Sequence, residues 1–279
     1  PNYAWGRLGD YLRETQLLGS IHSTLYWDQN TKMPSAGSAW RGDQLSLLAK
    51  LLHSRQTSKE FEELLVLAKQ EFISQDFDKD ISLNLEKQKN IELLEQDFNR
   101  QKRLDPELVV QLASAQSEGY NLWQQAKAKN DFPCFAPALK KLIFLRQEQS
   151  RQLNEDRSCW ETLAQPYEPD LTISRMKELF APLKKRLPEI LDSVRGTTKS
   201  IKVKWDLQEH SQQLLCDRLL NDWGINSQNT AIARSPHPFS ITLGPNDFRI
   251  TTRVVSGHPL SCFLATAHEW GHSLYEQGL

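Results

Sequence analysis

Apolar side chains at helical spacing run through most of the first 225 residues, and this periodicity constrains the fold more than any other feature. The intervening positions are rich in Leu, Glu, Lys and Gln, which favour helices. The pattern therefore predicts a mainly α fold. It is clearest in the stretches 80–101, 106–129, 136–155, 172–195 and 207–223, and at Leu8, Leu12, Leu17, Ile21, Phe61, Leu64, Leu65 and Ala68.

Helix-breaking residues separate these stretches, as expected for several helices joined by short connections. No fixed-period repeat is present, which argues against a solenoid. We expect a helical region over 1–225 and a smaller region over 226–279, together forming one continuous domain. The breakers are Met33-Pro34, Asp105-Pro106, Phe132-Pro133, Pro166 to Pro169, and Gly224.

Two β-prone runs, 237–243 and 247–255, flank the turn sequence Gly244-Pro245-Asn246 and predict a hairpin. Residues in the second run alternate in character, so one set faces the core and the other faces a second surface. The second set is either a polar platform beside a binding site or the solvated side of an edge strand. The core set is Phe248, Ile250 and Thr252, and the second set is Asp247, Arg249 and Thr251.

A last helix is predicted to begin near His258-Pro259, directly after the hairpin. Gly271 lies inside it and costs about 1 kcal/mol relative to alanine. This glycine either permits a close approach of backbone or substrate, or is merely tolerated. One broad face of the helix is predicted to carry Leu260, Phe263, Leu264, Ala267, His268, Gly271 and Tyr275.

The segment His268-Glu269-Trp270-Gly271-His272 has the spacing of a zinc-peptidase motif. Residues four apart lie on one helix face, so His268 and His272 can each give a ring nitrogen to one ion. Glu269 can then act as general base and return the proton to a leaving amine. The alternative is a pair of surface histidines that flank an exposed glutamate.

Composition excludes several other classes of protein. The net charge is −1, and no basic aromatic face marks a nucleic-acid binder. No apolar run reaches the ~18 residues of a membrane span, and no serine or cysteine hydrolase signature is present. The basic stretch 199–204 is expected to be a solvated loop. The four cysteines form no Cys-x-x-Cys pair, so we expect reduced thiols and a cytoplasmic location.

Several segments together resemble the M32 family of metallocarboxypeptidases, the carboxypeptidase Taq-like enzymes. Three signatures carry the resemblance: His237-Pro238-Phe239, the Asp-x-Arg-x-Thr pattern at 247–251, and the His-Glu-Trp-Gly-His segment at 268–272. The run 26–34, followed by Arg41, is similar to the opening region of the family. The resemblance spans essentially the whole chain.

This resemblance implies a predominantly helical fold with a small sheet at the active-site groove, and usually a homodimer. It implies a zinc- or cobalt-dependent enzyme that releases single residues from peptide C-termini with broad specificity. His268 and His272 would be metal ligands, and Glu269 the general base and acid. The groove and the shell behind the ligands would be formed by His237, Asp247, Arg249 and Thr251.

The resemblance breaks at the end of the sequence. The family's third metal ligand, in a His-Glu-Ser motif, and an arginine that binds the substrate carboxylate both come later in those enzymes. Glu276 lies on the same helix as His272 and would have to fold back to replace that ligand. We therefore expect a truncated fold whose two histidines hold metal weakly. It would be an inactive peptidase fragment, a short non-catalytic helical scaffold or binding module, or an enzyme completed in trans by a C-terminal half or by dimerisation.

Overall fold

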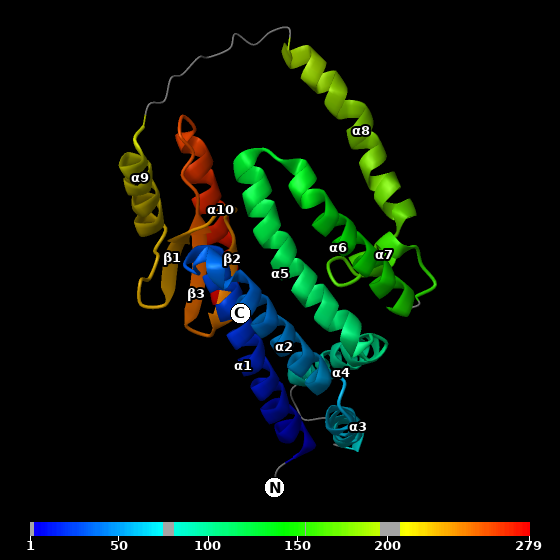
Figure 1. Ribbon diagram of the computed structural model, residues 1–279. Helices are drawn as coiled ribbons and strands as arrows, with labels where there is room; N and C mark the ends of the chain where they lie inside the picture. Colours follow the sequence, from blue (N-terminus) through cyan, green and yellow to red (C-terminus); the bar gives the residue numbers. More distant parts are fainter. Residues whose placement is uncertain (1–2, 75–80, 154, 196–206) are drawn as a thin grey trace.

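A computed structural model of the chain describes residues 3–74, 81–153, 155–195 and 207–279. Helices dominate this part of the chain, and a small three-stranded sheet lies beside the last helix (Figure 1). The predicted mainly α fold with a small sheet next to the histidine-bearing helix is confirmed. The helices are α1 (Ala4–Thr31), the short 3-10 helix η1 (Ser35–Gly37), α2 (Ser38–Gln56), α3 (Lys59–Ser74), α4 (Ile81–Lys102), α5 (Pro106–Lys129), α6 (Phe132–Leu153), α7 (Cys159–Ala164), α8 (Ile173–Arg195), α9 (Glu209–Asp222) and α10 (Pro259–Gln277); the strands are β1 (Thr230–Arg234), β2 (Ser240–Gly244) and β3 (Asp247–Thr252).

Local sequence signals set the ends of several helices. Asp105 caps α5 by accepting a hydrogen bond from the backbone N–H of Glu107 at 2.8 Å. Asn130 follows α5 in the left-handed region, with φ of 53°. Gly224 has φ of +79° just after α9, where a residue with a side chain would be strained. The breakers seen in the sequence therefore end or begin helices as predicted.

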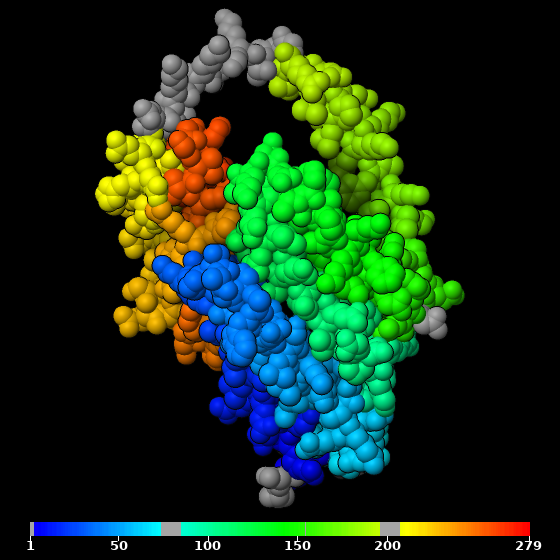
Figure 2. Space-filling view, viewed as in Figure 1, coloured from blue at the N-terminus to red at the C-terminus, as the bar shows by residue number. Residues whose placement is uncertain are grey.

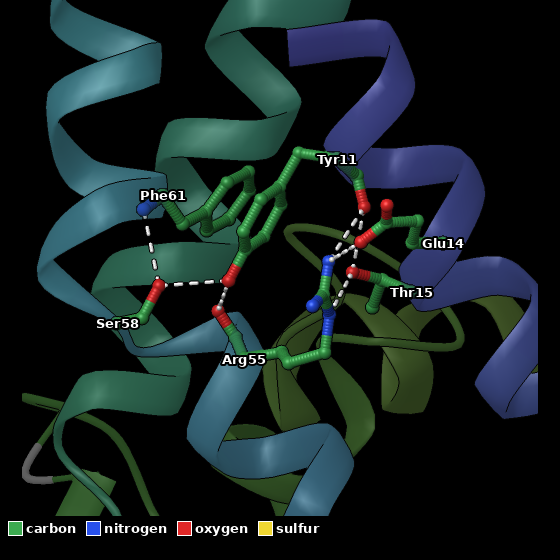
Figure 3. A network of polar contacts seen from close by, with 6 residues as sticks. All are labelled: Tyr11, Glu14, Thr15, Arg55, Ser58 and Phe61. Carbon is green, nitrogen blue, oxygen red and sulfur yellow. Dashed lines mark hydrogen bonds and ion pairs between the residues drawn. The ribbon is translucent and has the colours of Figure 1, made fainter. Parts of the chain in front are cut away.

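A first core joins α1, α3 and α4. Figure 3 shows the polar side of this junction, where the ring of Tyr11 stacks on that of Phe61 with the centroids 5.5 Å apart. The Tyr11 hydroxyl donates to the carbonyl oxygen of Arg55 at 2.8 Å, and the Arg55 guanidinium lies over the same ring. The buried members are Leu8, Tyr11, Phe61, Leu64, Leu65, Ala68 and Phe98. Two side chains predicted for the apolar face of α1, Leu17 and Ile21, are instead exposed.

A second core lies between α5 and α6, which form a helical hairpin with α2 packed against α5 (Figure 1). Leu112 and Leu145 from the two arms of the hairpin are among its buried side chains. The Gln29 side chain of α1 donates to the Ser117 hydroxyl of α5 at 2.9 Å in the interior. This bond and the packing of α1 against α2 and β2 tie the sheet to the central helices.

Helix α8 buries none of its residues against the rest of the described chain. Figure 2 shows its C-terminal end standing away from α5 and α10. Most of its apolar side chains, among them Phe180, Leu183 and Leu187, are exposed. The basic stretch 199–204 lies outside the described residues. No helix in the described part of the chain combines the length and apolar character needed to cross a membrane.

The sheet has the order β1-β3-β2. Strands β2 and β3 are antiparallel, so the predicted hairpin is confirmed. Strand β1 pairs in parallel with β3 and was not predicted from the sequence. Because β3 is the central strand, the interpretation of its polar residues as the solvated side of an edge strand is wrong.

Helices cover both faces of this sheet. On one face, Ile250 packs with Leu220 of α9 and Trp270 of α10. On the other face, the Ser20 hydroxyl of α1 donates to the carbonyl oxygen of Leu243 at 2.6 Å. Helices α1 and α9 of the 1–225 region thus enclose the sheet together with α10 of the 226–279 region. The division at residue 225, within one continuous domain, stays a prediction.

Candidate metal centre

Helix α10 brings the imidazole rings of His268 and His272 together on its exposed side. Their Nε2 atoms lie 3.1 Å apart, and the ring planes are nearly perpendicular, at 87°. Two imidazole nitrogens on one tetrahedral zinc ion, with bonds of about 2.05 Å, would be separated by about 3.3 Å. The two rings therefore already have nearly the spacing that a shared ion requires.

The donor chemistry fits a transition-metal ion such as zinc, because imidazole nitrogen is a common ligand of such ions. The number of candidate ligands is smaller than the three that a catalytic zinc site usually has. Within the described residues, no group of three or more His, Cys, Asp or Glu side chains converges on one point. The Glu276 carboxylate lies 3.5 Å from the Thr242 hydroxyl of β2, at the side of the neighbouring groove. The described part of the chain thus brings together two imidazoles that could serve as ligands.

Glu269 lies between the histidines in sequence and is largely buried, with 8% of its surface exposed. Burial raises the pKa of this carboxyl because water no longer solvates its charged form, and the nearby His268, His272 and His237 partly offset that rise. A carboxyl with a raised pKa exchanges a proton more readily near neutral pH. Glu269 is therefore suited to proton transfer beside the two imidazoles.

His237 is exposed and lies in the loop between β1 and β2, near enough to Glu269 to lower its pKa. The Ser235 hydroxyl donates to the backbone carbonyl of His237 at 2.6 Å. Thr251 is fully buried, and its hydroxyl lies 2.7 Å from that of Ser235 and accepts from the backbone N–H of Phe239 at 2.9 Å. Thr251 thus anchors the loop that carries His237 near Glu269.

Asp247 and Arg249 lie on the opposite face of the sheet from α10. Arg249 donates from Nε and Nη2 to the two carboxylate oxygens of Asp247, each at 2.8 Å. This carboxylate raises the pKa of the Arg249 guanidinium, which also lies over the Trp27 ring, 4.7 Å from its centroid. The structure therefore places both residues against α1, while His268, Glu269 and His272 lie across the sheet.

The buried face of α10 differs from the predicted one. Leu260, Leu264 and Tyr275 of the predicted apolar face are 50%, 62% and 68% exposed. Buried polar residues replace them because β3 supplies hydrogen-bond partners: the Thr266 hydroxyl lies 2.7 Å from that of Thr252. The side chains that α10 buries are Pro259, Cys262, Thr266, Glu269, Trp270 and Ser273.

Gly271 faces open space. A β-carbon added at this position would meet no atom within 4 Å in the described structure. The close backbone approach considered for this glycine is therefore not made within the described chain. The remaining explanations for a glycine inside this helix are that a bound substrate approaches it closely or that the helix merely tolerates it.

An open groove of about 540 Å³ runs beside the histidines between α10 and β2. Glu269 and His272 form one wall, and Phe239 and Thr242 form the other. Thr242 was not predicted from the sequence as a site residue. The polar Thr242 follows the apolar Ile241 in a β-prone run, and this alternation could have indicated that Thr242 lies on a separate surface of the strand. Tyr275 and Glu276 extend the first wall toward the end of α10.

Two convergent helix-borne imidazoles, a buried carboxyl beside them and a groove along an edge strand define a candidate metallopeptidase centre. The family model of the carboxypeptidase Taq (M32) metallopeptidases matches residues 7–279. The chain belongs to this M32 family.

Individual relatives agree with this assignment. The thermostable carboxypeptidase 1 of Thermus thermophilus is 31% identical over 292 residues, covering 100% of this chain and 56% of the relative. The crystal structure of the M32 carboxypeptidase from Deinococcus radiodurans matches with a TM-score of 0.81 and 27% identity, over 99% of this chain and 54% of that one. The chain thus spans about half the length of the curated relatives that it matches.

Proposed function

We propose that this chain supplies the two-histidine part of a metal-dependent carboxypeptidase that releases C-terminal residues from peptides. The 3.1 Å spacing of the His268 and His272 Nε2 atoms carries the proposal, because it fits two ligands of one ion. Membership of the M32 family supports the carboxypeptidase activity. A bound zinc or cobalt ion would activate water and polarise the scissile carbonyl.

In this proposal, Glu269 moves the proton. Its raised pKa lets the carboxylate take a proton from the attacking water and return it to the leaving amine. His237 faces the same carboxyl from the loop that Thr251 anchors, and helps to set its charge. Asp247 and Arg249 support the fold behind the groove by holding β3 against Trp27 of α1.

The groove between α10 and β2 is the proposed site for the peptide. Strand β2 lies at the edge of the sheet, so its outer side faces away from β3. An extended peptide can form backbone hydrogen bonds with such an edge. Phe239, Thr242 and Tyr275 would then contact its side chains, which fits the broad specificity implied by the family.

We further propose that the 279 residues bind metal weakly and are inactive alone. Catalytic zinc sites usually have three protein ligands and one open position, and the described residues bring together two. The missing ligand would come from a C-terminal half or from a second copy in a homodimer.

The test is the release of C-terminal residues from a peptide in the presence of zinc or cobalt. We expect none from this chain alone. We expect release when a separately produced polypeptide is added that comprises the part of the Thermus thermophilus relative unmatched by this chain. Glu269→Gln should lower that release by about 10²- to 10⁴-fold.

An exposed carboxylate outside the groove, Glu63 of α3, is the control, and Glu63→Gln should leave the release intact. Chelator-sensitive release by the unaltered chain alone would contradict the proposed dependence on a third ligand. Release from the mixture that is unchanged by Glu269→Gln would contradict the proton-transfer role.

A helical scaffold or binding module is the second candidate function. The uncovered apolar row of α8, including Phe180, Leu183 and Leu187, favours it, because such rows usually pack against a partner. This candidate predicts no peptide release under any of the conditions above. It would gain support if the mixture stayed inactive while the two polypeptides formed a stable complex.

We also propose a cytoplasmic location. All four cysteines, two exposed and two buried, are free thiols. Reduced thiols are typical of proteins in a reducing compartment. No interaction with nucleic acid is proposed, because the net charge of −1 provides no field that would attract it.

A further inference from the structure

Two buried cysteines face each other across the contact between α9 and α10. Cys216 and Cys262 are 1% and 0% exposed, and their Sγ atoms lie 3.4 Å apart. Both are free thiols. They are 46 residues apart in the sequence, so no short motif marks them as a pair.

We propose that Cys216 and Cys262 are an oxidation site at which a peroxide forms a disulfide that links α9 to α10. A disulfide bond is about 2.05 Å long, so the two sulfurs must approach by about 1.4 Å in total. Because α9 and α10 already pack side by side, rotation of the two side chains can supply this approach.

Two threonine hydroxyls hold the thiols in this arrangement. The Thr266 hydroxyl, which donates to the carbonyl oxygen of Cys262 at 2.9 Å, lies 3.5 Å from Cys216 Sγ, and the Thr252 hydroxyl lies 3.5 Å from Cys262 Sγ. The threonine hydroxyls are themselves 2.7 Å apart. All four side chains are at most 2% exposed. The pair is therefore pre-positioned by β3 as well as by the two helices.

The chemistry balances with one peroxide for each pair. One cysteine sulfur attacks a peroxide oxygen, the O–O bond breaks, and a sulfenic acid and one water form. The second sulfur attacks the sulfenic sulfur, the S–O bond breaks, and a second water leaves with the remaining thiol proton. The sulfurs are oxidised and the peroxide is reduced. Burial raises the pKa of Cys216 to about 11, so its thiolate is scarce and the reaction is slow.

The disulfide would tie down the helix that carries His268, Glu269 and His272. Cys262 lies earlier on α10, on its buried side, and Cys216 anchors it to α9. Closing a loop of this length restricts the unfolded chain and lowers the unfolding equilibrium constant by up to roughly a thousandfold. The proposal concerns this packing alone and does not rest on peptidase activity.

The experiment uses the folded chain with Cys134→Ser and Cys159→Ser, because both replaced cysteines are exposed and lie outside the core. The chain is treated with hydrogen peroxide, free thiols are alkylated, and trypsin digestion follows without reductant. We expect residues 205–218 to be linked to residues 254–279, since trypsin cuts after Lys204, Arg218 and Arg253. The oxidised chain should also unfold at a higher urea concentration, and a reductant should reverse that shift.

The reciprocal variant, Cys216→Ser with Cys262→Ser, keeps the exposed cysteines and should show no such gain in urea resistance. The proposal is overturned if the folded chain yields only free or singly oxidised thiols while the linked peptides form in urea. It is equally overturned if the linked chain unfolds at a lower urea concentration than the reduced one. Linked peptides from the folded chain, together with a higher urea midpoint, support it.

Discussion

The hydroxyl of Thr252 lies 2.7 Å from the hydroxyl of Thr266, deep between the central strand β3 and helix α10. Both residues are at most 2% exposed. Thr266 precedes His268 by two residues, so this contact fixes the histidine-bearing helix on the sheet. The neighbouring Thr251 points to the other face and anchors the His237 loop. Adjacent residues of β3 thus position the two sides of the candidate site.

Replacement of Thr266 by valine should destabilise the chain. The change keeps the side-chain shape but leaves the Thr252 hydroxyl buried without its closest partner, at a cost of about 1–3 kcal/mol. The double change Thr252→Val and Thr266→Val should cost less than the sum of the two single changes, because both partners are then removed. Urea unfolding of the four chains measures this. If the costs of the two single changes simply add in the double variant, the contact between the two hydroxyls does not stabilise the chain.

Replacement of Gly271 by alanine should stabilise this chain by up to about 1 kcal/mol, because alanine favours a helix and the new β-carbon meets nothing within 4 Å. Gly119 of α5 is the matched control, since a β-carbon there would lie 3.0 Å from Leu142 Cδ1. Gly119→Ala should gain less or lose stability. Thermal unfolding compares the two variants, and equal gains would count against the open space beside Gly271.

Replacement of Arg249 by lysine should lower stability by about 0.5–1 kcal/mol. Lysine lacks the planar fork that binds both oxygens of Asp247 and stacks on Trp27. The partner change Asp247→Asn should cost less, because the stacking on Trp27 remains. Urea unfolding at low and high salt measures both variants. If the variant keeps its stability and loses only the release of C-terminal residues from the peptide, then Arg249 acts on the peptide instead.

Stability should fall as pH rises from about 9 to 11 through the ionisation of Cys216. Burial raises the pKa of Cys216 from 9.0 to about 11, so the folded chain holds this proton more tightly than the unfolded chain. The contribution is fully present below pH 9 and is lost through pH 11, by on the order of 2 kcal/mol. Urea unfolding at pH 8 and 10.5 measures the slope. Cys216→Ser should have a shallower slope, and identical slopes would contradict the burial effect.

Helix boundaries could be predicted where local chemistry decides them. Asp105 with Pro106 begins α5 at the predicted residue, and Gly224 follows α9. Strand β1 could not be predicted, because it is short and gains its hydrogen bonds from parallel pairing with β3, which follows later in the chain. Only Thr230 of this strand is buried, and apolar and polar residues do not alternate regularly along it.

The candidate site was predictable in its spacing but not in its surroundings. The four-residue interval between His268 and His272 is local, and the structure brings their rings together. The buried face of α10 depends on partners from distant segments. Thr266 and Cys262 can be buried because Thr252 of β3 and Cys216 of α9 contact their polar atoms. Hydropathy along one helix contains no such information, so the apolar residues were assigned to the wrong side.

Metal titration tests the central claim most directly. Cobalt binding to the folded chain, followed by its visible absorption and by competition with zinc, should show one weak site. His268→Ala and His272→Ala should each weaken it by at least about tenfold, while His258→Ala, an exposed histidine at the start of the same helix, should leave it unchanged. Equal cobalt binding by all four chains would contradict the claim that His268 and His272 form the metal centre.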